Sequence, residues 1–201
     1  MKNNGDVVGV IMVGPPGCGK DTQAKFLEKN GVCVFGTGDF LRKRCLEDSL
    51  FNQKYGKLMS DGGLLPDDVV VDTFYFYFNK LPAGISWVMN GFPRTVGQYE
   101  RVRTTLLAKK KKYPIVVLLF KFISREELLE RVASRKRAEM RNDDKEDSFL
   151  RRIEEYNENA PKLLRAMKKD CFRIAEVDAS MPVEILHARI DGVMKLLLQK
   201  S

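Results

Sequence analysis

The sequence lacks the features that mark most membrane, secreted and metal-binding proteins. No apolar run approaches the ~20 residues needed to cross a bilayer. The short polar N-terminus, residues 1–6, has the pattern of neither a secretory signal nor an Arg/Ser-rich transit peptide. The four cysteines are scattered and form no C-x-x-C pair, which argues against a zinc site and for reduced thiols. We therefore expect a cytoplasmic protein with no membrane partner.

Histidine and tryptophan are also scarce, with one residue of each, and there are no repeats or low-complexity linkers. The single histidine, His187, falls in the predicted last helix, which argues against a role as general base. Trp87 falls in a predicted strand and is expected in the core. Apolar residues make up 44% and charged residues 31% of a chain of 201, so we expect one globular domain over residues 1–201.

One sign of charge is in excess, because the formal net charge is +8. Such a charge raises the alternative of a nucleic-acid-associated protein, which would show strongly salt-dependent DNA or RNA binding. The basic run Lys109–Lys112 has no interleaved aromatic residues, and basic runs are usually solvated faces. We therefore expect no nucleic-acid partner.

What the sequence does have is a regular alternation of apolar strands and helices. Strands are predicted at residues 7–13, 32–35, 85–89, 115–120 and 172–177. Helices are predicted at residues 20–29, 39–47, 52–59, 66–79, 95–109, 124–136, 147–157, 160–169 and from Pro182, with a polar break at 138–145. Ser124 and Glu127 form the pattern of a capping box. The alternation predicts an α/β three-layer sandwich, a five-stranded parallel sheet with helices on both faces and ligands at the carboxyl ends of the strands.

A glycine-rich loop, Gly14–Thr22, directly follows the first predicted strand. Its glycines allow backbone N–H groups to surround a phosphate, Lys20 supplies a point charge, and the helix that follows adds its dipole. The alternative is an ordinary Gly-Pro turn, but strand, loop, lysine and helix are all present. The loop therefore predicts a P-loop NTPase fold, although Asp21 stands where the strict pattern has Ser or Thr and Thr22 follows it.

The loop, G-x-P-G-x-G-K-x-T-Q in form, and several later segments resemble the adenylate kinase family in the family's order. The matching segments are Thr37–Arg42, Met59 with Asp61–Pro66, Gly91–Thr95 with Gln98, Arg131 with Arg135, Arg141–Asp144 with Arg152, and Asp178–Ser180 with Pro182. Each segment alone is weak evidence. Together they extend from residue 14 to residue 182, so the resemblance covers nearly the whole chain and is specific.

The resemblance implies a role for each matched residue. Catalytic groups would be Lys20, Arg94, Arg131, Arg135, Arg141 and Arg152. ATP would contact Gly14, Pro16, Gly17, Cys18, Gly19, Lys20, Asp21, Thr22, Arg131 and Pro182. AMP would contact Thr37, Leu41, Arg42, Met59, Gly63, Leu65, Val70, Gly91, Arg94 and Gln98. Arginine suits these roles because its fork grips phosphate bidentately. Met59, Leu65 and Val70 could equally be core residues, and the neighbouring Arg151 could replace Arg152.

The resemblance also implies the domain organisation. Residues 36–80 would form the insertion that binds the nucleoside monophosphate, and residues 131–152 a short lid. The segment between Arg135 and Arg141 leaves no room for the long lid of some family members, and the short-lid type is usually monomeric. Lid and insertion would close over the substrates and exclude water, which would otherwise accept the phosphoryl group.

The expected substrates are ATP and AMP, with UMP/CMP kinase activity as the alternative. The UMP/CMP kinases, also of the short-lid type, usually carry Ala where this chain has Thr37. They also usually have an asparagine-rich stretch where this chain has Thr95–Gln98. Both positions favour AMP as the acceptor.

The expected cofactor is Mg²⁺, but this chain departs from the family at its site. The family usually has Asp, which holds Mg²⁺ through water, where this chain has Asn90. Asp21 adds a carboxylate nearby, so we expect Asp21 to contact Mg²⁺ or its water, Asn90 to be a neutral hydrogen-bonding partner and Asp39 to hold another water. The alternative is that Asp21 repels the phosphates and the chain is a catalytically weak nucleotide-binding protein.

Overall fold

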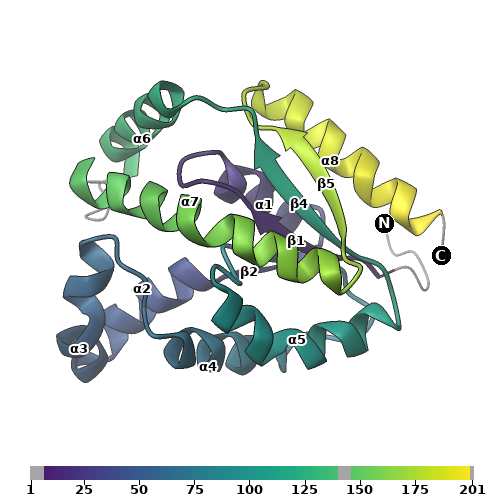
Figure 1. Cartoon of the computed structure of the whole chain (residues 1–201), viewed down its shortest axis with the longest axis horizontal. Coiled ribbons are helices and arrows are strands. Elements are labelled where there is room, and N and C mark those ends of the chain that lie inside the picture. The colour runs from purple at the N-terminus through teal and green to yellow at the C-terminus, as the bar shows by residue number, and fades with distance from the viewer. Residues whose placement is uncertain (1–6, 140–145, 200–201) are drawn as a thin grey trace.

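The computed structural model describes residues 7–139 and 146–199 and contains a five-stranded, all-parallel sheet in the order β2-β3-β1-β4-β5 (Figure 1). The strands are β1 (Gly9–Val13), β2 (Cys33–Gly36), β3 (Trp87–Asn90), β4 (Ile115–Lys121) and β5 (Arg173–Asp178). Each lies within about two residues of its predicted range. Continuous apolar runs of this kind are typical of parallel strands that are covered on both faces.

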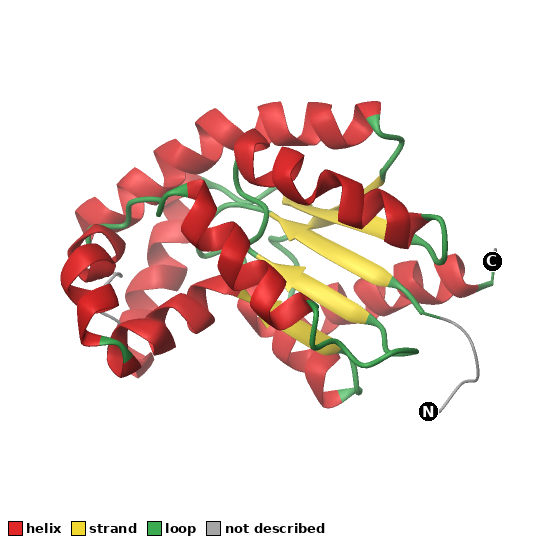
Figure 2. Cartoon of the chain, turned by 90° about the horizontal axis from the view of Figure 1, so that it is seen from below, coloured by secondary structure: helices red, strands yellow, loops and turns green. Residues whose placement is uncertain are grey.

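Alternate residues of the strands face two separate cores. Ile11 and Val13 of β1 contact one core, which is completed by α4 (Asp67–Phe78), α5 (Val96–Lys110) and the second half of α7 (Glu146–Lys169). Val10 and Met12 face the other core, with α1 (Lys20–Lys29), α6 (Arg125–Glu139) and α8 (Val183–Leu198). Figure 2 shows the sheet between these two layers of helices. The predicted three-layer α/β sandwich is therefore confirmed.

The segment between β2 and β3 is helical. It consists of α2 (Thr37–Glu47), α3 (Ser49–Ser60) and α4. The Asp48 carboxylate caps α3 by accepting a hydrogen bond from the Phe51 N–H (2.9 Å). In Figure 1, α2 and α3 project beyond the sheet at the end where its strands terminate. The segment is therefore attached to the rest of the chain mainly through α4, which packs on α5 and β2.

The predicted break between residues 157 and 160 is wrong, because α7 is one continuous helix with Pro161 inside it. An apolar stripe runs the length of this helix and packs against the two cores through Phe149, Ile153, Tyr156, Ala160, Leu163 and Met167. Burial of the whole stripe outweighs the backbone hydrogen bond that Pro161 cannot donate. Near the proline, the Asn159 side-chain amide donates to the Glu155 carbonyl (2.9 Å).

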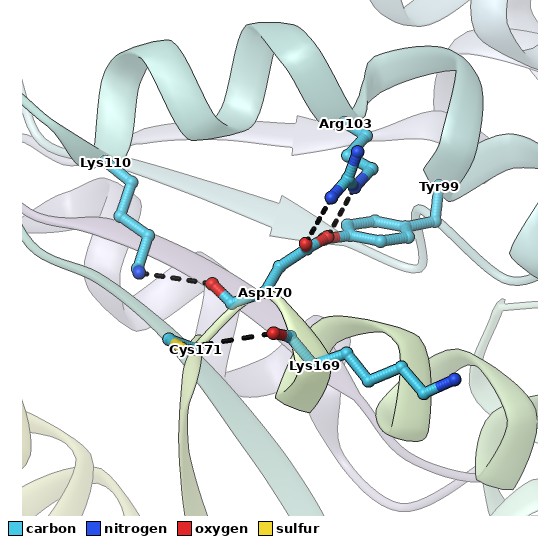
Figure 3. Close-up of polar contacts among 6 residues, drawn as sticks. All are labelled: Tyr99, Arg103, Lys110, Lys169, Asp170 and Cys171. Atoms are coloured by element: carbon cyan, nitrogen blue, oxygen red, sulfur yellow. Dashed lines mark hydrogen bonds and ion pairs between the residues drawn. The ribbon is translucent and has the colours of Figure 1, made fainter.

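The C-terminal end of α7 is fastened to α5 by a compact polar cluster (Figure 3). The Asp170 carboxylate accepts two hydrogen bonds from Arg103 (2.6 and 2.5 Å) and one from the Tyr99 hydroxyl (2.5 Å). Lys110 donates to the Asp170 backbone carbonyl (3.2 Å). The hydrogen bonds from Arg103 and then Tyr99 lower the pKa of Asp170 to about 2, so this carboxylate is charged at neutral pH.

The start of α6 agrees with its predicted cap, since the Ser124 hydroxyl accepts a hydrogen bond from the Glu127 N–H (3.1 Å). The helix continues to Glu139, into the predicted break at 138–145, and residues 140–145 lie outside the described part. Trp87 is buried, as predicted, and donates from Nε1 to the Tyr113 hydroxyl (3.0 Å). In residues 7–139 and 146–199, no helix is both long and apolar enough to cross a membrane.

Candidate active site

A cleft of about 790 Å³ opens at the carboxyl ends of β1 and β3. The glycine loop forms its floor, and α2, α6, α7 and the start of α8 supply its walls. Its lining includes most residues predicted for the ATP site, namely Gly14, Pro16, Gly17, Gly19, Lys20, Asp21, Thr22, Arg131 and Pro182. These residues come from segments far apart in the sequence, and the parallel sheet brings them to one edge.

The glycine loop has the backbone conformation that a phosphate cradle requires. Gly17 (φ 82°) and Gly19 (φ 94°) are both left-handed, a region that residues with a side chain rarely adopt. The Lys20 ammonium donates to the carbonyls of Gly14 (2.6 Å) and Pro15 (2.8 Å). The lysine charge is therefore held against the loop, at the N-terminus of α1, where an anion is favoured.

Cys18 differs from its neighbours in the loop, because its side chain is fully buried and lines neither cavity of the site. The thiol sulfur lies 3.3 Å from Lys20 Nζ. Its side chain packs into the core beneath the loop, so the predicted contact of Cys18 with ATP remains a prediction for its backbone N–H. All four cysteines lie in the described part of the chain, and each is a free thiol.

Four guanidinium groups converge on the same cleft, those of Arg42, Arg94, Arg131 and Arg152. Desolvation by the surrounding protein and the positive charges of Arg152 and Arg42 lower the pKa of Arg94 to about 10. The Arg94 side chain is open to the cleft, so water screens these charges and the group stays protonated at neutral pH. This accumulation of positive charge favours the binding of polyanions in the cleft.

The two remaining predicted arginines cannot be placed in the site. Arg141 lies outside the described residues. Arg135 belongs to α6, but only its backbone is described. Of the adjacent pair on α7, Arg152 lines the cleft, whereas Arg151 is exposed and forms an ion pair with Glu155 (3.5 Å).

A second, smaller cavity of about 60 Å³ adjoins the cleft under α2. It is lined by every residue predicted for the AMP site, namely Thr37, Leu41, Arg42, Met59, Gly63, Leu65, Val70, Gly91, Arg94 and Gln98. Arg42, Arg94 and Arg152 line both cavities. These three charges therefore lie at the junction of the two compartments.

The walls of the small cavity are mostly fixed by contacts within the protein. Leu65 and Val70 are buried core residues and also line the small cavity, and their contact with AMP stays a prediction. Thr37 donates from its hydroxyl to the Gly91 carbonyl (3.2 Å). The buried Gln98 accepts a hydrogen bond at Oε1 from the Arg94 N–H (2.8 Å), which orients its amide so that Nε2 is the donor end.

The three residues predicted for the magnesium site all line the large cleft. Asn90 donates from Nδ2 to the Asp21 carboxylate (2.7 Å), so these two side chains are in direct contact. Asp39 instead forms an ion pair with Arg42 (2.5 Å). Within the described ranges, no group of three or more His, Cys, Asp or Glu side chains could hold a metal ion.

Sequence reasoning missed three acidic residues of the cleft, Glu127, Glu130 and Glu155. Glu127 pairs with Arg131 (2.5 Å), one turn away on α6. Glu155 accepts a hydrogen bond from the Leu64 N–H (3.4 Å), and burial raises the pKa of this carboxyl. Helical spacing could have indicated Glu127 and Glu155, because residues three or four positions from the predicted arginines lie on the same face of a helix. Glu127 was instead read only as part of a cap, and Glu130 and Glu155 were not considered.

Comparison with known proteins agrees with this geometry. The family model described as adenylate kinase matches residues 12–171. An adenylate kinase of Hyphomonas neptunium is 33% identical over 187 residues, covering 92% of this chain and 97% of that relative. One from Xanthobacter autotrophicus is 30% identical over 192 residues, covering 92% and 97%. The chain belongs to the adenylate kinase family.

Membership of the adenylate kinase family fixes the general chemistry of the cleft. The protein is a nucleoside monophosphate kinase, a phosphotransferase that binds nucleotides, ATP among them. Phosphoryl transfer requires little covalent chemistry from the protein and depends on positioning and charge neutralisation. The cradle of main-chain groups and the converging guanidiniums described above are suited to both tasks.

Proposed function

We propose that this enzyme catalyses the reversible, Mg²⁺-dependent transfer of a phosphoryl group from ATP to AMP, giving two ADP. The observation that carries the proposal is the position of Arg42, Arg94 and Arg152, which line both the large cleft and the small cavity. A phosphoryl group moving between two nucleotides must cross this junction. Three cations there can neutralise the charge that spreads over the phosphate oxygens in the transition state.

The residues divide naturally between the two nucleotides. The loop and Lys20 would hold the ATP phosphates, with Arg131 and Pro182 on the walls of the same cleft beside the ATP base. Arg42 and Arg94 would hold the AMP phosphate with bidentate forks and orient it for in-line attack. Mg²⁺, when bound with ATP, would neutralise phosphate charge and orient the chain of phosphates, and Asp21 and Asn90 are the candidates to hold it.

The acceptor is proposed to be AMP, and the orientation of Gln98 is compatible with an adenine base. Its Oε1 is engaged by the Arg94 N–H, which leaves Nε2 as a donor for a base in the small cavity. Adenine has ring nitrogens that accept such a hydrogen bond. The bases of GMP, CMP and UMP also carry acceptors, so Gln98 is compatible with AMP, and the preference for AMP over UMP and CMP rests on Thr37 and Thr95–Gln98, where this chain differs from the UMP/CMP kinases.

The test is a panel of acceptors, AMP, UMP, CMP and GMP, with ATP or GTP as donor and formation of the acceptor's own nucleoside diphosphate as the readout. We expect AMP to exceed UMP and CMP at least tenfold in kcat/KM, about 1.4 kcal/mol. In Gln98→Ala the preference should shrink while kcat for AMP changes less. A preference for UMP or CMP would assign the alternative kinase activity. Binding of ATP and AMP with no turnover would assign the weak nucleotide-binding protein.

We further propose that one chain suffices for catalysis and that residues 36–80 and 131–152 act as the monophosphate-binding insertion and the short lid. A single chain supplies the lining of both cavities, so no second subunit is required. Free thiols at all four cysteines are compatible with a reducing, cytoplasmic location. Closure of the two segments would exclude water from the transferred group.

A further inference from the structure

The starts of α1 and α8 meet beside the large cleft, and each belongs to a different wall of it. α1 packs against α8, with Ala24 and Leu27 sharing a core with Leu186. The glycine loop leads directly into α1. Residues 180–183, which lead into α8 and line the cleft, are called the base wall because Pro182 is predicted beside the ATP base. A donor nucleotide would therefore extend across this junction, with its phosphates on the loop and its base against the base wall.

A buried glutamine of α1 spans the junction. Gln23 is only 1% exposed, and its backbone N–H donates to the Gly19 carbonyl of the loop (3.1 Å). Its side-chain Nε2 donates to the Val183 carbonyl (3.0 Å), across 160 positions of sequence. Val183 lines the cleft directly after Pro182. One side chain therefore ties the helix that follows the phosphate loop to the base wall.

The oxygen of the same amide is held by the single histidine of the chain. Gln23 Oε1 lies 3.2 Å from His187 Nδ1. The Val183 carbonyl can only accept a hydrogen bond, so Nε2 faces it and Oε1 faces the imidazole. Because Oε1 also only accepts, His187 Nδ1 carries a proton and donates to it. The imidazole ring in turn stacks on Phe26 of α1, with 4.7 Å between ring centroids, so the amide is fixed at both ends.

This arrangement can act on a bound nucleotide only through the walls of the cleft. The side chains of Gln23 and His187 do not line it, whereas Lys20 lines it from the α1 side and Met181 and Pro182 from the base wall. The base and the phosphates of one nucleotide are joined covalently, so both can be held at once only if the two walls keep the right spacing. Moving the walls apart would leave a buried amide without its partners, which is costly. The bridge therefore resists a change in that spacing.

We propose that the Gln23 amide, oriented by His187, holds the base wall in position relative to the glycine loop and so contributes to affinity for the nucleoside of the triphosphate donor. The proposal rests on the proposed binding of ATP in the large cleft. Both residues are positioning residues, and the phosphates are still held by the loop and Lys20. Loss of the bridge should therefore weaken ATP without weakening AMP or an inorganic polyphosphate. This role requires no proton transfer by His187.

The test is steady-state kinetics of the full chain, with ATP and AMP varied separately. In Gln23→Met, which is similar in length but removes both side-chain hydrogen bonds, KM for ATP should rise about tenfold, as expected for the loss of one or two such bonds. Both kcat and KM for AMP should stay within about twofold, since the lost interaction is equal in the ground and transition states. Inorganic tripolyphosphate has no base, so its inhibition constant against ATP should also stay within about twofold.

Two substitutions of His187 separate the hydrogen bond from the ring contact. His187→Phe keeps a ring against Phe26 but removes the donor, and KM for ATP should rise about threefold. His187→Asn loses the ring but carries an amide donor in place of Nδ1–H, so KM for ATP should return towards the parent value. The matched control is Tyr113→Phe, which removes a hydroxyl that accepts from Trp87 (3.0 Å). Tyr113 lines neither cavity and precedes β4 at the opposite end of the sheet, so no kinetic constant should change.

Three results would overturn the proposal. If Gln23→Met weakens tripolyphosphate as much as ATP, or lowers kcat with KM for ATP unchanged, Gln23 only shapes the loop. If KM for ATP is unchanged in His187→Phe but raised in His187→Asn, the ring stack and not the hydrogen bond is responsible. If neither histidine variant changes KM for ATP, the contact serves the core alone. His187 is half-buried, so its variants decide the question even if Gln23→Met does not fold. Failure of the proposed function would look different, because the unaltered protein would then not turn over ATP and AMP.

Discussion

The two ends of α7 handle charge in opposite ways. At its C-terminal end, Asp170 meets Arg103 and Tyr99, and each partner satisfies the other. At its N-terminal half, Arg152 faces Arg94 and Arg42, and desolvation together with these like charges lowers the pKa of Arg94 to about 10. One end of the helix is electrostatically complete without a ligand. The other end is strained by repulsion that a bound polyphosphate would relieve.

This contrast separates the stabilising part of the helix from its functional part. Paired charges with several hydrogen bonds contribute to stability, whereas unfavourable clusters persist only where function requires them. The anchored end lies against α5 in the core layer, and the charged half lines both cavities of the site. Substitutions at the two ends should therefore have opposite profiles, with activity changing at one and stability at the other.

The largest expected effect is on activity at the repulsive end. Arg94→Ala should lower kcat/KM about 10³-fold, in the range of arginines that neutralise a transferring phosphoryl group. Its unfolding temperature in the absence of nucleotide should stay the same or rise, because repulsion with Arg42 and Arg152 is removed. The matched control is Arg101→Ala, an arginine of α5 that lines neither cavity and should keep near-normal activity. A large loss of stability with little loss of turnover would contradict the comparison.

The next effect is on stability at the anchored end. Asp170→Asn should lower the free energy of unfolding by about 2 kcal/mol, because charge-assisted hydrogen bonds from Arg103 are weakened. For a chain of this size, that corresponds to a fall of about 4–8 °C in the melting temperature. Turnover at 25 °C should change less than twofold. Asp191→Asn, which removes an acid paired with Lys195 at 3.8 Å on the exposed side of α8, is the control and should have almost no effect.

The difference in unfolding free energy between the parent and Asp170→Asn should depend on pH. That dependence tests whether the Asp170 carboxylate is the cause of the difference. The folded-state pKa of Asp170 is lowered to about 2, from an ordinary value of about 3.8 in the unfolded chain. A lowered pKa contributes stability that is complete above the unfolded value and is lost as pH falls through the folded value. The gap between the parent and Asp170→Asn, measured by urea unfolding, should be constant from pH 7 to 5 and shrink towards pH 2. A gap that persists unchanged at low pH would assign the effect to packing.

The sheet and the loop could be predicted from the sequence because their signals are local. Apolar runs such as Ile115–Phe120 predict buried parallel strands, and the spacing within Gly14–Thr22 predicts the phosphate cradle. The AMP-site residues could be named only from the ordered motifs of the family. That Leu65 and Val70 are both core and lining could not be foreseen, because the sequence does not show which side of a buried side chain faces a cavity.

Long-range polar contacts were mostly beyond prediction. The Asp170 cluster joins residues 60 to 71 positions apart, and nothing in the local pattern near Asp170 indicates a partner on α5. The partnership of Asp21 and Asn90 was expected only because both depart from the family pattern. The continuity of α7 was missed because the apolar stripe from Phe149 to Met167, which crosses the predicted break at 157–160, was not used.

Pro161 lies between the two halves of α7. Replacing it therefore tests whether the N-terminal half can move independently of the anchored C-terminal end. Pro161→Ala restores a backbone donor to the helix but also gives the unfolded chain more freedom, so we expect a net gain in stability of only about 1 kcal/mol. If the proline lets the half that carries Arg152 adjust to bound nucleotides while the Asp170 end stays fixed, kcat should fall about two- to threefold and the affinity for AMP should change little. Ser148→Ala, at the other end of the helix, removes the hydroxyl that donates to the Ser60 carbonyl (2.9 Å) and serves as the comparison for general effects on α7. Unchanged kcat in a more stable Pro161→Ala enzyme would mean that α7 acts as one rigid rod, and the division between its ends would then be electrostatic alone.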